Sequence, residues 1–258
     1  MPESPIVGSQ TLDRALTVLL EVARNGERGL TLAQCSAILG LSKATTHRTL
    51  RTLLQREFLR LDEERGLYTL GITNLRLGVQ FLERLDVRRE ALPVLRALAE
   101  HVGETVHLGT LSHTVIVYIE KVESPQAVRM FSRVGDTMPA YSTGIGKAML
   151  AFLPEGEVEA HLPERLLPRT EHTIVDRDVL RAELDRTRER GYSKDEVENE
   201  EGIRCVGAPV FDHSGRVQAG ISIAGPEQRM TSERLASLGP VVREYADRIS
   251  TALGHDVE

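Results

Sequence analysis

The sequence has no tryptophan, an aromatic content of only 4% and just two cysteines. So few aromatic rings argue against a platform on which sugars or nucleobases stack. The cysteines, Cys35 and Cys205, lie far apart in dissimilar surroundings, so no disulfide framework is expected. No apolar run approaches the roughly 20 residues that span a bilayer, and the N-terminus lacks the basic start and apolar core of a signal peptide. We therefore expect a cytoplasmic protein with no membrane partner.

The sequence also lacks the spacing of a metal or nucleotide site. Its eight histidines show no ligand pattern such as His-x-x-x-His. The run Gly144-Ile145-Gly146-Lys147 resembles part of a phosphate-binding loop, but Tyr141 and Ala148 stand where that loop needs glycine and serine or threonine. We expect no metal and no cofactor. Two interpretations of the run stay open: a helix N-terminus that holds a carboxylate, or glycines that allow close packing.

The charge is unevenly distributed along the chain. The net charge is -6, yet the segment from Ser42 to Arg60 holds five basic residues and a single acidic one, Glu57. A locally basic helix on an acidic chain is typical of a small DNA-reading module attached to a larger body. A solvated helix face is the alternative. The length, 258 residues, allows one or two domains.

Caps and apolar spacing predict three helices in the first 55 residues. Ser9 begins a helix to about Arg24, whose apolar stripe we place at Leu12, Ala15, Leu16, Leu19, Leu20 and Ala23. Thr31 begins the second, which Gly40 ends and which turns Leu32, Cys35, Ile38 and Leu39 inward. Ser42 caps the third helix after a very short turn, which is the spacing of a helix-turn-helix.

The third helix has two chemically distinct faces. Thr46, Leu50, Leu53 and Leu54 fall on one side, with His47 at its margin. The other side carries short polar groups followed by arginines, which can approach a groove and reach guanine edges or phosphates. Strands at 58–61 and 67–70 around a turn predict a two-stranded wing. We predict DNA contacts by Ser42, Lys43, Ala44, Thr45, Arg48, Arg51, Thr52 and Gln55. A generic helical subdomain is the alternative.

The rest of the chain predicts a linker and an α+β domain. A helix from Ile72 to about Leu85 has too many apolar residues to stand alone, so it should pack on a partner chain. Strands and helices then alternate as helices on a largely antiparallel sheet. The predicted domains are 1–70, 71–86 and 87–258. The expected elements are helices 87–102, 142–153, 176–190 and 232–253, strands 105–111, 114–119, 128–131, 205–211 and 217–224, a hairpin turn at Ser112-His113, and a loop at 135–139.

Possible catalytic residues do not form a recognisable set. Cys205 opens an apolar strand and is expected to be a buried thiol rather than a nucleophile. Most of the acidic run Asp195, Glu196, Glu198, Glu200 and Glu201 should be solvated. His107 lies on a predicted strand, where a core or pocket position is expected. The chain is therefore not expected to be an enzyme, although an enzyme that uses Cys205 or the acidic run stays as the alternative.

Two segments resemble the IclR family of bacterial transcriptional regulators. The first comprises residues 9–16 and 40–48, which look like the family's winged helix-turn-helix. The second stands at the spacing of the family signature, and the likeness covers essentially the whole chain. Its matching residues are Gly191, Asp195, Glu198, Cys205, Val206, Gly207, Val210, Phe211 and Asp212.

The resemblance implies a GAF-like effector-binding domain after the linker, a dimer formed by the winged domains and linker, and often a dimer of dimers. It also implies a small organic acid held by the backbone of Gly144 and Ile145 and the side chains of Asp195 and Cys205; we include His107 in this site. Ile145 is bulkier than is usual in the family, which should either narrow the pocket or give the ligand a more apolar surface. The expected function is a ligand-responsive repressor of a small catabolic operon, bound to an inverted-repeat operator on double-stranded DNA.

Overall fold

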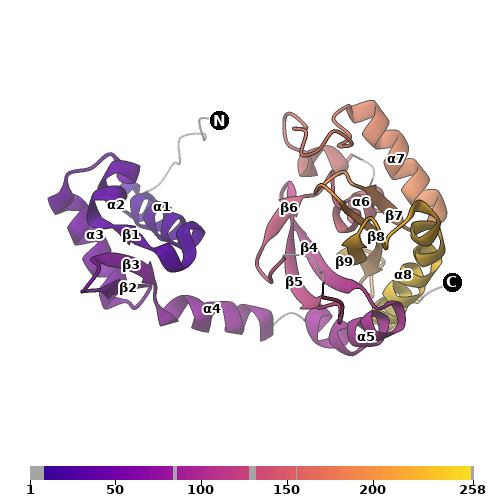
Figure 1. Ribbon diagram of the computed structural model, residues 1–258, viewed down its shortest axis with the longest axis horizontal. Coiled ribbons are helices and arrows are strands. Elements are labelled where there is room, and N and C mark those ends of the chain that lie inside the picture. The colour runs from indigo at the N-terminus through magenta and orange to yellow at the C-terminus, as the bar shows by residue number, and fades with distance from the viewer. Residues whose placement is uncertain (1–8, 84–85, 128–131, 155, 257–258) are drawn as a thin grey trace. The chain divides into compact units, whose positions relative to one another are not determined.

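The computed structural model describes residues 9–83, 86–127, 132–154 and 156–256 (Figure 1). The chain divides into two compact units, Met1–Arg84 and Leu85–Glu258, and the helix expected as a linker belongs to the first. The predicted α+β class is confirmed, with a helical winged unit followed by an antiparallel sheet with helices. Within the described ranges, no helix is both long and apolar enough to cross a membrane.

The three predicted caps begin the first three α-helices. The hydroxyl oxygens of Ser9, Thr31 and Ser42 each accept a backbone N–H from the first turn, worth about 1 kcal/mol apiece. Gly40 ends the second helix in the left-handed conformation, as a C-cap glycine does. The first unit consists of α1 (Gln10–Asn25), η1 (Gly26–Arg28), β1 (Leu30–Thr31), α2 (Leu32–Leu39), α3 (Lys43–Gln55), β2 (Leu59–Asp62), β3 (Leu67–Leu70) and α4 (Ile72–Glu83).

The core of the first unit corrects two of the predicted faces. In α1 the fully buried residues are Val18 and Val22, which pack with Cys35 and Leu50. The predicted stripe is wrong at four positions, because Ala23 is exposed and Leu12, Leu16 and Leu20 are 60%, 50% and 59% exposed. Ile38 of α2, expected inward, is 41% exposed. Helix α1 is apolar on two sides, and periodicity alone does not tell which side meets the core.

The wing is a three-stranded sheet rather than the predicted pair. Strands β2 and β3 are antiparallel, and the turn between them is closed by Asp62, whose carboxylate accepts the N–H groups of Glu64 and Arg65. The additional strand β1 pairs with β3 on its other edge, with Leu30 opposite Tyr68. Strand β1 has only two residues, too few for an alternating pattern, which is why the sequence did not reveal it.

Helix α4 is fastened to the segment that follows α3. The backbone N–H of Gly71 donates to the carbonyl of Phe58 (2.9 Å), and that of Thr73 donates to the carbonyl of Glu57 (3.1 Å). The Asn74 amide also donates to the Phe58 carbonyl, at 2.7 Å. A Cβ at Gly71 would lie 2.1 Å from the Glu57 oxygen, so only glycine allows this approach. The start of α4 and the end of α3 are thus held together backbone to backbone.

The second unit is built on a six-stranded antiparallel sheet in the order β6-β5-β4-β9-β8-β7 (Figure 1). Helix α6 packs on β8 and β9 and against α7, while α5 and α8 pack together and against the sheet. The elements are α5 (Asp86–Val102), β4 (Thr105–Ser112), β5 (Val115–Val122), β6 (Thr137–Pro139), α6 (Gly144–Ala151), η2 (Val158–His161), α7 (Arg177–Arg190), β7 (Ser193–Glu196), β8 (Ile203–Phe211), β9 (Val217–Pro226) and α8 (Ser232–Ala252).

Several predictions for the second unit need correction. Strand β6 lies in the segment expected as a loop, and β7 lies in the acidic run. The β4–β5 turn falls at His113-Thr114, one residue later than predicted. The sequence Ser-Lys-Asp-Glu of β7 has no apolar alternation; its pairing with β8 makes it a strand. The strand predicted at 128–131 and Leu85, the expected end of the linker helix, lie outside the described residues.

Candidate functional site

The structure places the predicted DNA-contacting residues along one side of α3 and its cap. All of them are exposed except Thr45, which is half-buried, whereas Thr46, Leu50 and Leu53 are buried. Among the described residues, neither the Arg48 nor the Arg51 side chain has an ion-pair or hydrogen-bond partner. Both guanidinium groups are therefore solvent-exposed and, within the described residues, make no polar contact that stabilises the fold. They lie on the face of α3 that the sequence predicts to contact DNA.

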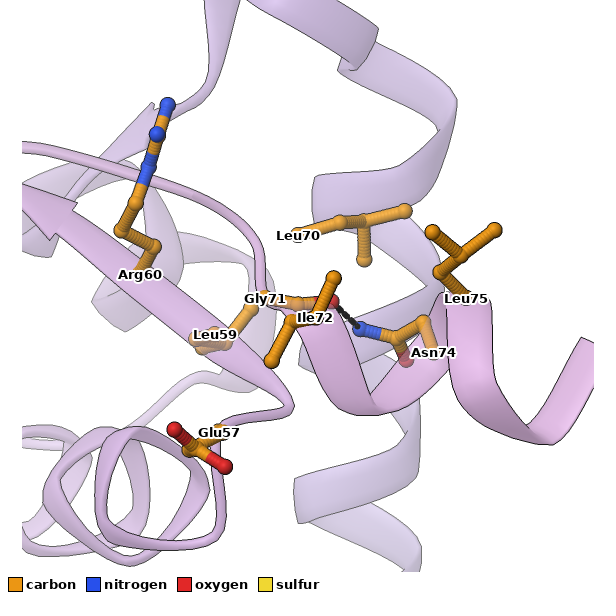
Figure 2. A pocket seen from close by; sticks show the side chains of 8 residues that line it. All are labelled: Glu57, Leu59, Arg60, Leu70, Gly71, Ile72, Asn74 and Leu75. Atoms are coloured by element: carbon orange, nitrogen blue, oxygen red, sulfur yellow. Dashed lines mark hydrogen bonds between the residues drawn. The ribbon is translucent and has the colours of Figure 1, made fainter.

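A groove beside the wing was not expected from the sequence. It has a volume of about 740 Å³ and lies where β2 and β3 meet the start of α4 (Figure 2). Leu70, Ile72 and Leu75 line it and are 42%, 53% and 62% exposed. The Asn74 amide, which donates to the Gly71 carbonyl at 2.9 Å, lies beside it. The groove adds an apolar surface to a winged unit that already exposes leucines on α1.

The N-terminus of α6 shows that glycine is needed in this run for close packing. A Cβ at Gly146 would lie 2.1 Å from the Ala140 carbonyl oxygen, so Gly146 is there for close packing. Gly144 is closely packed as well. A Cβ there would lie 2.7 Å from the Cys205 sulfur, and the Gly144 backbone N–H is directed at that sulfur. Thr143 caps the helix by accepting the N–H of Gly146 at 3.1 Å.

Asp195 joins the end of β7 to this helix terminus. One of its carboxyl oxygens accepts the N–H of Glu198 at 2.7 Å, and the other lies 3.5 Å from the Cys205 sulfur. Burial raises the pKa of Asp195 to about 7, against the opposing field of the Lys147 ammonium. Burial also raises the pKa of Cys205. The thiol is thus neutral, and the Asp195 carboxyl changes between its protonated and ionised forms near neutral pH.

The prediction that most of the acidic run is solvated is confirmed, because Glu196, Glu200 and Glu201 are exposed; Asp195 and Glu198 are the exceptions. Asp195 and Glu198 are only 3% and 7% exposed, and Glu198 forms an ion pair with Lys147, which is fully buried. In the part of the chain that the structure describes, the second carboxyl oxygen of Glu198 has no hydrogen-bond partner. Sequence reasoning missed this pair. The signal that could have revealed it is that Lys147 follows an otherwise apolar helix start, where an unpaired lysine would be costly.

These groups surround a cavity of about 10 Å³, which is space for about one water molecule. Four of the five predicted effector residues, Gly144, Ile145, Asp195 and Cys205, line it. The side chain of Ile145 reaches the sheet over two facing glycines, Gly109 and Gly220, so its bulk is accommodated there. The complete lining is Tyr118, Thr143, Gly144, Ile145, Asp195, Asn199, Ile203, Cys205, Ser222 and Ala224.

His107, the fifth predicted effector residue, lies behind this lining rather than in it. Its ring stacks on Tyr118 with centroids 4.6 Å apart, and its Nε2 shares a hydrogen bond with the Ser132 hydroxyl at 2.8 Å. Burial, helped by the Lys121 charge, lowers its pKa to about 3. His107 is therefore neutral and supports the Tyr118 wall.

Comparison with known families shows which family the chain belongs to. A model of the IclR helix-turn-helix domain matches residues 11–63, and a model of the bacterial transcriptional regulator IclR C-terminal domain matches residues 79–251. The chain belongs to the IclR family. This membership confirms the resemblance that residues 9–16, 40–48 and the signature segment indicated.

Individual IclR-family members match over nearly their full length. The HTH-type transcriptional regulator XynR of Escherichia coli (strain K12) is 35% identical over 97% of this chain and 99% of its own. The HTH-type transcriptional repressor AllR of Klebsiella pneumoniae is 36% identical over 96% and 91%. The crystal structure of Thermotoga maritima IclR superimposes with a TM-score of 0.77 at 35% identity, covering 95% and 99%. These relatives are regulators, so the enzyme alternative is not supported.

The protonation of Asp195 gives this IclR-family chain a measurable pH dependence. Its pKa in the folded protein is above the ordinary value, so its contribution to stability is complete at low pH and is lost as pH rises through about 7. Asp195→Asn keeps the group neutral at every pH. Relative to the unchanged protein, the variant should therefore gain up to about 4 kcal/mol between pH 4 and pH 8. Denaturant unfolding across this range measures the gain.

Asp212→Asn is the control for that series. The pKa of Asp212 is lowered, chiefly by the Ser214 hydroxyl, so this carboxylate stabilises the fold once it is ionised. Its contribution is already present above the unfolded-state pKa, so the replacement should cost nearly the same stability at every pH from 4 to 8. A stability difference for Asp195→Asn that does not change between pH 4 and pH 8 would contradict the assignment.

Proposed function

We propose that this chain is a ligand-responsive repressor that binds an inverted-repeat operator through α3. The observation that carries the proposal is the pair of exposed arginines, Arg48 and Arg51, on the outer face of a capped helix-turn-helix; neither has a polar partner among the described residues. Each α3 enters a major groove, where Ala44 and Thr45 allow close approach and the arginines reach guanine edges or phosphates. Ser42, Lys43, Thr52 and Gln55 complete the contact surface, and the wing touches the backbone.

An inverted repeat calls for two copies of the winged unit, and the exposed apolar residues support such a dimer. Leu12, Leu16 and Leu20 form one stripe along α1, and Ile72, Leu75, Leu77 and Val79 are exposed on α4. Apolar surface of this extent rimmed by polar residues marks a protein interface. We infer that the winged units and linker helices of two chains cover these faces, and that two dimers associate into a tetramer.

We infer that the effector of the second unit is a small organic acid. Its carboxylate would take the backbone N–H groups of Gly144 and Ile145 at the start of α6, where a helix favours negative charge, and would replace the Cys205 sulfur at the Gly144 N–H. Asp195 in its protonated form donates a hydrogen bond, which suits a carboxylate partner, and Cys205 adds a thiol beside it. His107 stays behind Tyr118 as a support.

Acid binding would then favour one arrangement of the winged units and change operator affinity by thermodynamic linkage. Repression is supported by the relative AllR, which is named a repressor. A repressor of a small catabolic operon, acting in the cytoplasm where the DNA is, fits these features together.

The test is binding of the full-length protein to the DNA upstream of its own gene. We expect specific binding whose affinity falls steeply with salt, because each neutralised phosphate releases counterions. We also expect small organic acids to raise the melting temperature of the unchanged protein but not that of Asp195→Ala. Binding without any salt dependence would reject DNA recognition by α3, and acids that shift both proteins equally would place the effector elsewhere.

A further inference from the structure

The cavity proposed for the effector is too small for any organic acid. Its 10 Å³ of free space holds about one water molecule, and even the smallest carboxylic acids have several non-hydrogen atoms. One wall must therefore move before a ligand enters. The cavity has three walls, and the way each is packed indicates which one moves.

Two of the walls belong to the tightly packed core. Tyr118, Cys205 and Ser222 lie within strands of the central sheet, each paired with its neighbours. The start of α6 lies directly on that sheet, since a Cβ at Gly207 would be only 2.6 Å from the carbonyl carbon of Gly144. Separating these walls would break backbone packing and sheet hydrogen bonds together, which interiors resist.

The third wall is the connection between β7 and β8, residues 197–202, which we name the strap. It contributes Asn199 to the cavity, while Glu200 and Glu201 are exposed on its outer side. Val197 holds a φ of +68°, a left-handed conformation that is rare and strained for a β-branched residue. Such strain persists only where surrounding contacts impose it, and it is released if the segment moves.

Individual polar contacts hold the strap closed. The Thr170 hydroxyl donates to the Val197 carbonyl at 2.6 Å, and the Thr173 hydroxyl donates to the Glu198 carbonyl at 2.7 Å. The Ser142 hydroxyl lies 3.1 Å from the Asn199 amide oxygen. Each of these three is a neutral hydrogen bond, which contributes little net stability by itself. The Arg169 guanidinium adds a charged donor from outside α6, to the Asn199 carbonyl at 3.0 Å.

The ion pair between Lys147 and Glu198 is the one charged contact among the described residues that ties the strap to α6. Lys147 is fully buried, so separating the pair removes its direct ion-pair partner and leaves the ammonium with only the fields of Asp195 and Glu183. We propose that the strap is the gate of the effector cavity and that the Lys147–Glu198 ion pair is its latch. This proposal depends on the proposed function in one respect, because it takes this cavity as the effector site.

The labelling rate of the Cys205 thiol measures opening of the gate without any effector. It lines the cavity and is 7% exposed, so a reagent such as N-ethylmaleimide reaches it only when the strap opens. Labelling of the full chain at pH 8, followed by peptide mass spectrometry, separates Cys205 from Cys35, which is buried in the winged unit and serves as an internal reference. Glu198→Gln should speed Cys205 labelling at least about tenfold. Thr170→Val, which leaves the ion pair intact, should speed it about threefold.

Leu180→Ala is the matched control. Leu180 is buried on α7 against α6, away from the strap, so its loss lowers the stability of the second unit without touching the latch. We expect the melting temperature to fall and Cys205 labelling to stay unchanged. The gate is rejected if both strap variants label at the original rate, or if Leu180→Ala speeds labelling as much as Glu198→Gln. Either result would leave operator binding and the acid-induced shift untouched.

Discussion

Arg48→Ala should abolish specific operator binding while the fold and acid binding stay intact. The guanidinium is exposed and makes no contact in the described structure, so its removal costs the fold almost nothing. A bidentate pair between arginine and guanine is worth about 1–3 kcal/mol, and a dimer on an inverted repeat loses two of them. The expected loss is thus about 2–6 kcal/mol, or roughly 30-fold to more than 10,000-fold in affinity. Fluorescence anisotropy and footprinting measure it.

Arg24→Ala provides the control for this substitution. Arg24 is an equally exposed arginine at the end of α1, paired only on the surface with Glu21. Its replacement removes the same charge from the winged unit but nothing from the α3 face, so specific binding should stay close to that of the unchanged protein. A normal footprint with Arg48→Ala would show that α3 does not read the operator.

Gly146→Ala should severely destabilise the second unit. The added Cβ would lie 2.1 Å from the Ala140 carbonyl oxygen and 2.5 Å from its Cα, and both are backbone atoms that cannot rotate away. Overpacking of a core costs about 1–3 kcal/mol where side chains can yield, and more where they cannot. With more than about 3 kcal/mol lost, the melting temperature of this unit should fall by about 10 °C, measured by calorimetry.

Gly78→Ala is the matched change in another helix. Gly78 lies within α4, and a Cβ there meets nothing within 4 Å. Alanine is the better helix former by about 1 kcal/mol, so this variant should be as stable as the unchanged protein or more so. Equal melting temperatures for Gly146→Ala and the unchanged protein would mean that α6 is not packed on Ala140 as described.

The winged unit was predictable because its signals are local. Ser9, Thr31 and Ser42 each mark a helix start by a hydroxyl that accepts a nearby N–H, and such caps are visible in a short window of sequence. The inward and outward faces of α3 follow from helical periodicity in the same way. Periodicity failed on α1, where Leu12 belongs to a second apolar face that the core does not use.

The second site was predictable only in part, because its contacts join distant segments. From the residues alone, Cys205 was predicted to be a buried, unreactive thiol. Only the family resemblance predicted that it shares a site with Asp195 and Gly144. Lys147 and Glu198 are 51 positions apart, so no local pattern links them. The acidic composition of the run suggested that most of it is solvated, and three of its five carboxylates are; only Asp195 and Glu198 are buried. Burial of charge is a tertiary property, set by the partner that the fold supplies.

The joint between α3 and α4 has a mechanical consequence. Because Gly71, Thr73 and Asn74 hold the start of α4 to the carbonyls that follow α3, the two helices should turn as one rigid lever. Helix α3 has 13 residues, which makes it an arm of about 20 Å. A turn of about 10° at the joint shifts the far end of such an arm by about 3.5 Å, the rise of one base pair. Small motions of the linker helix are therefore enough to move the reading face out of register with its DNA.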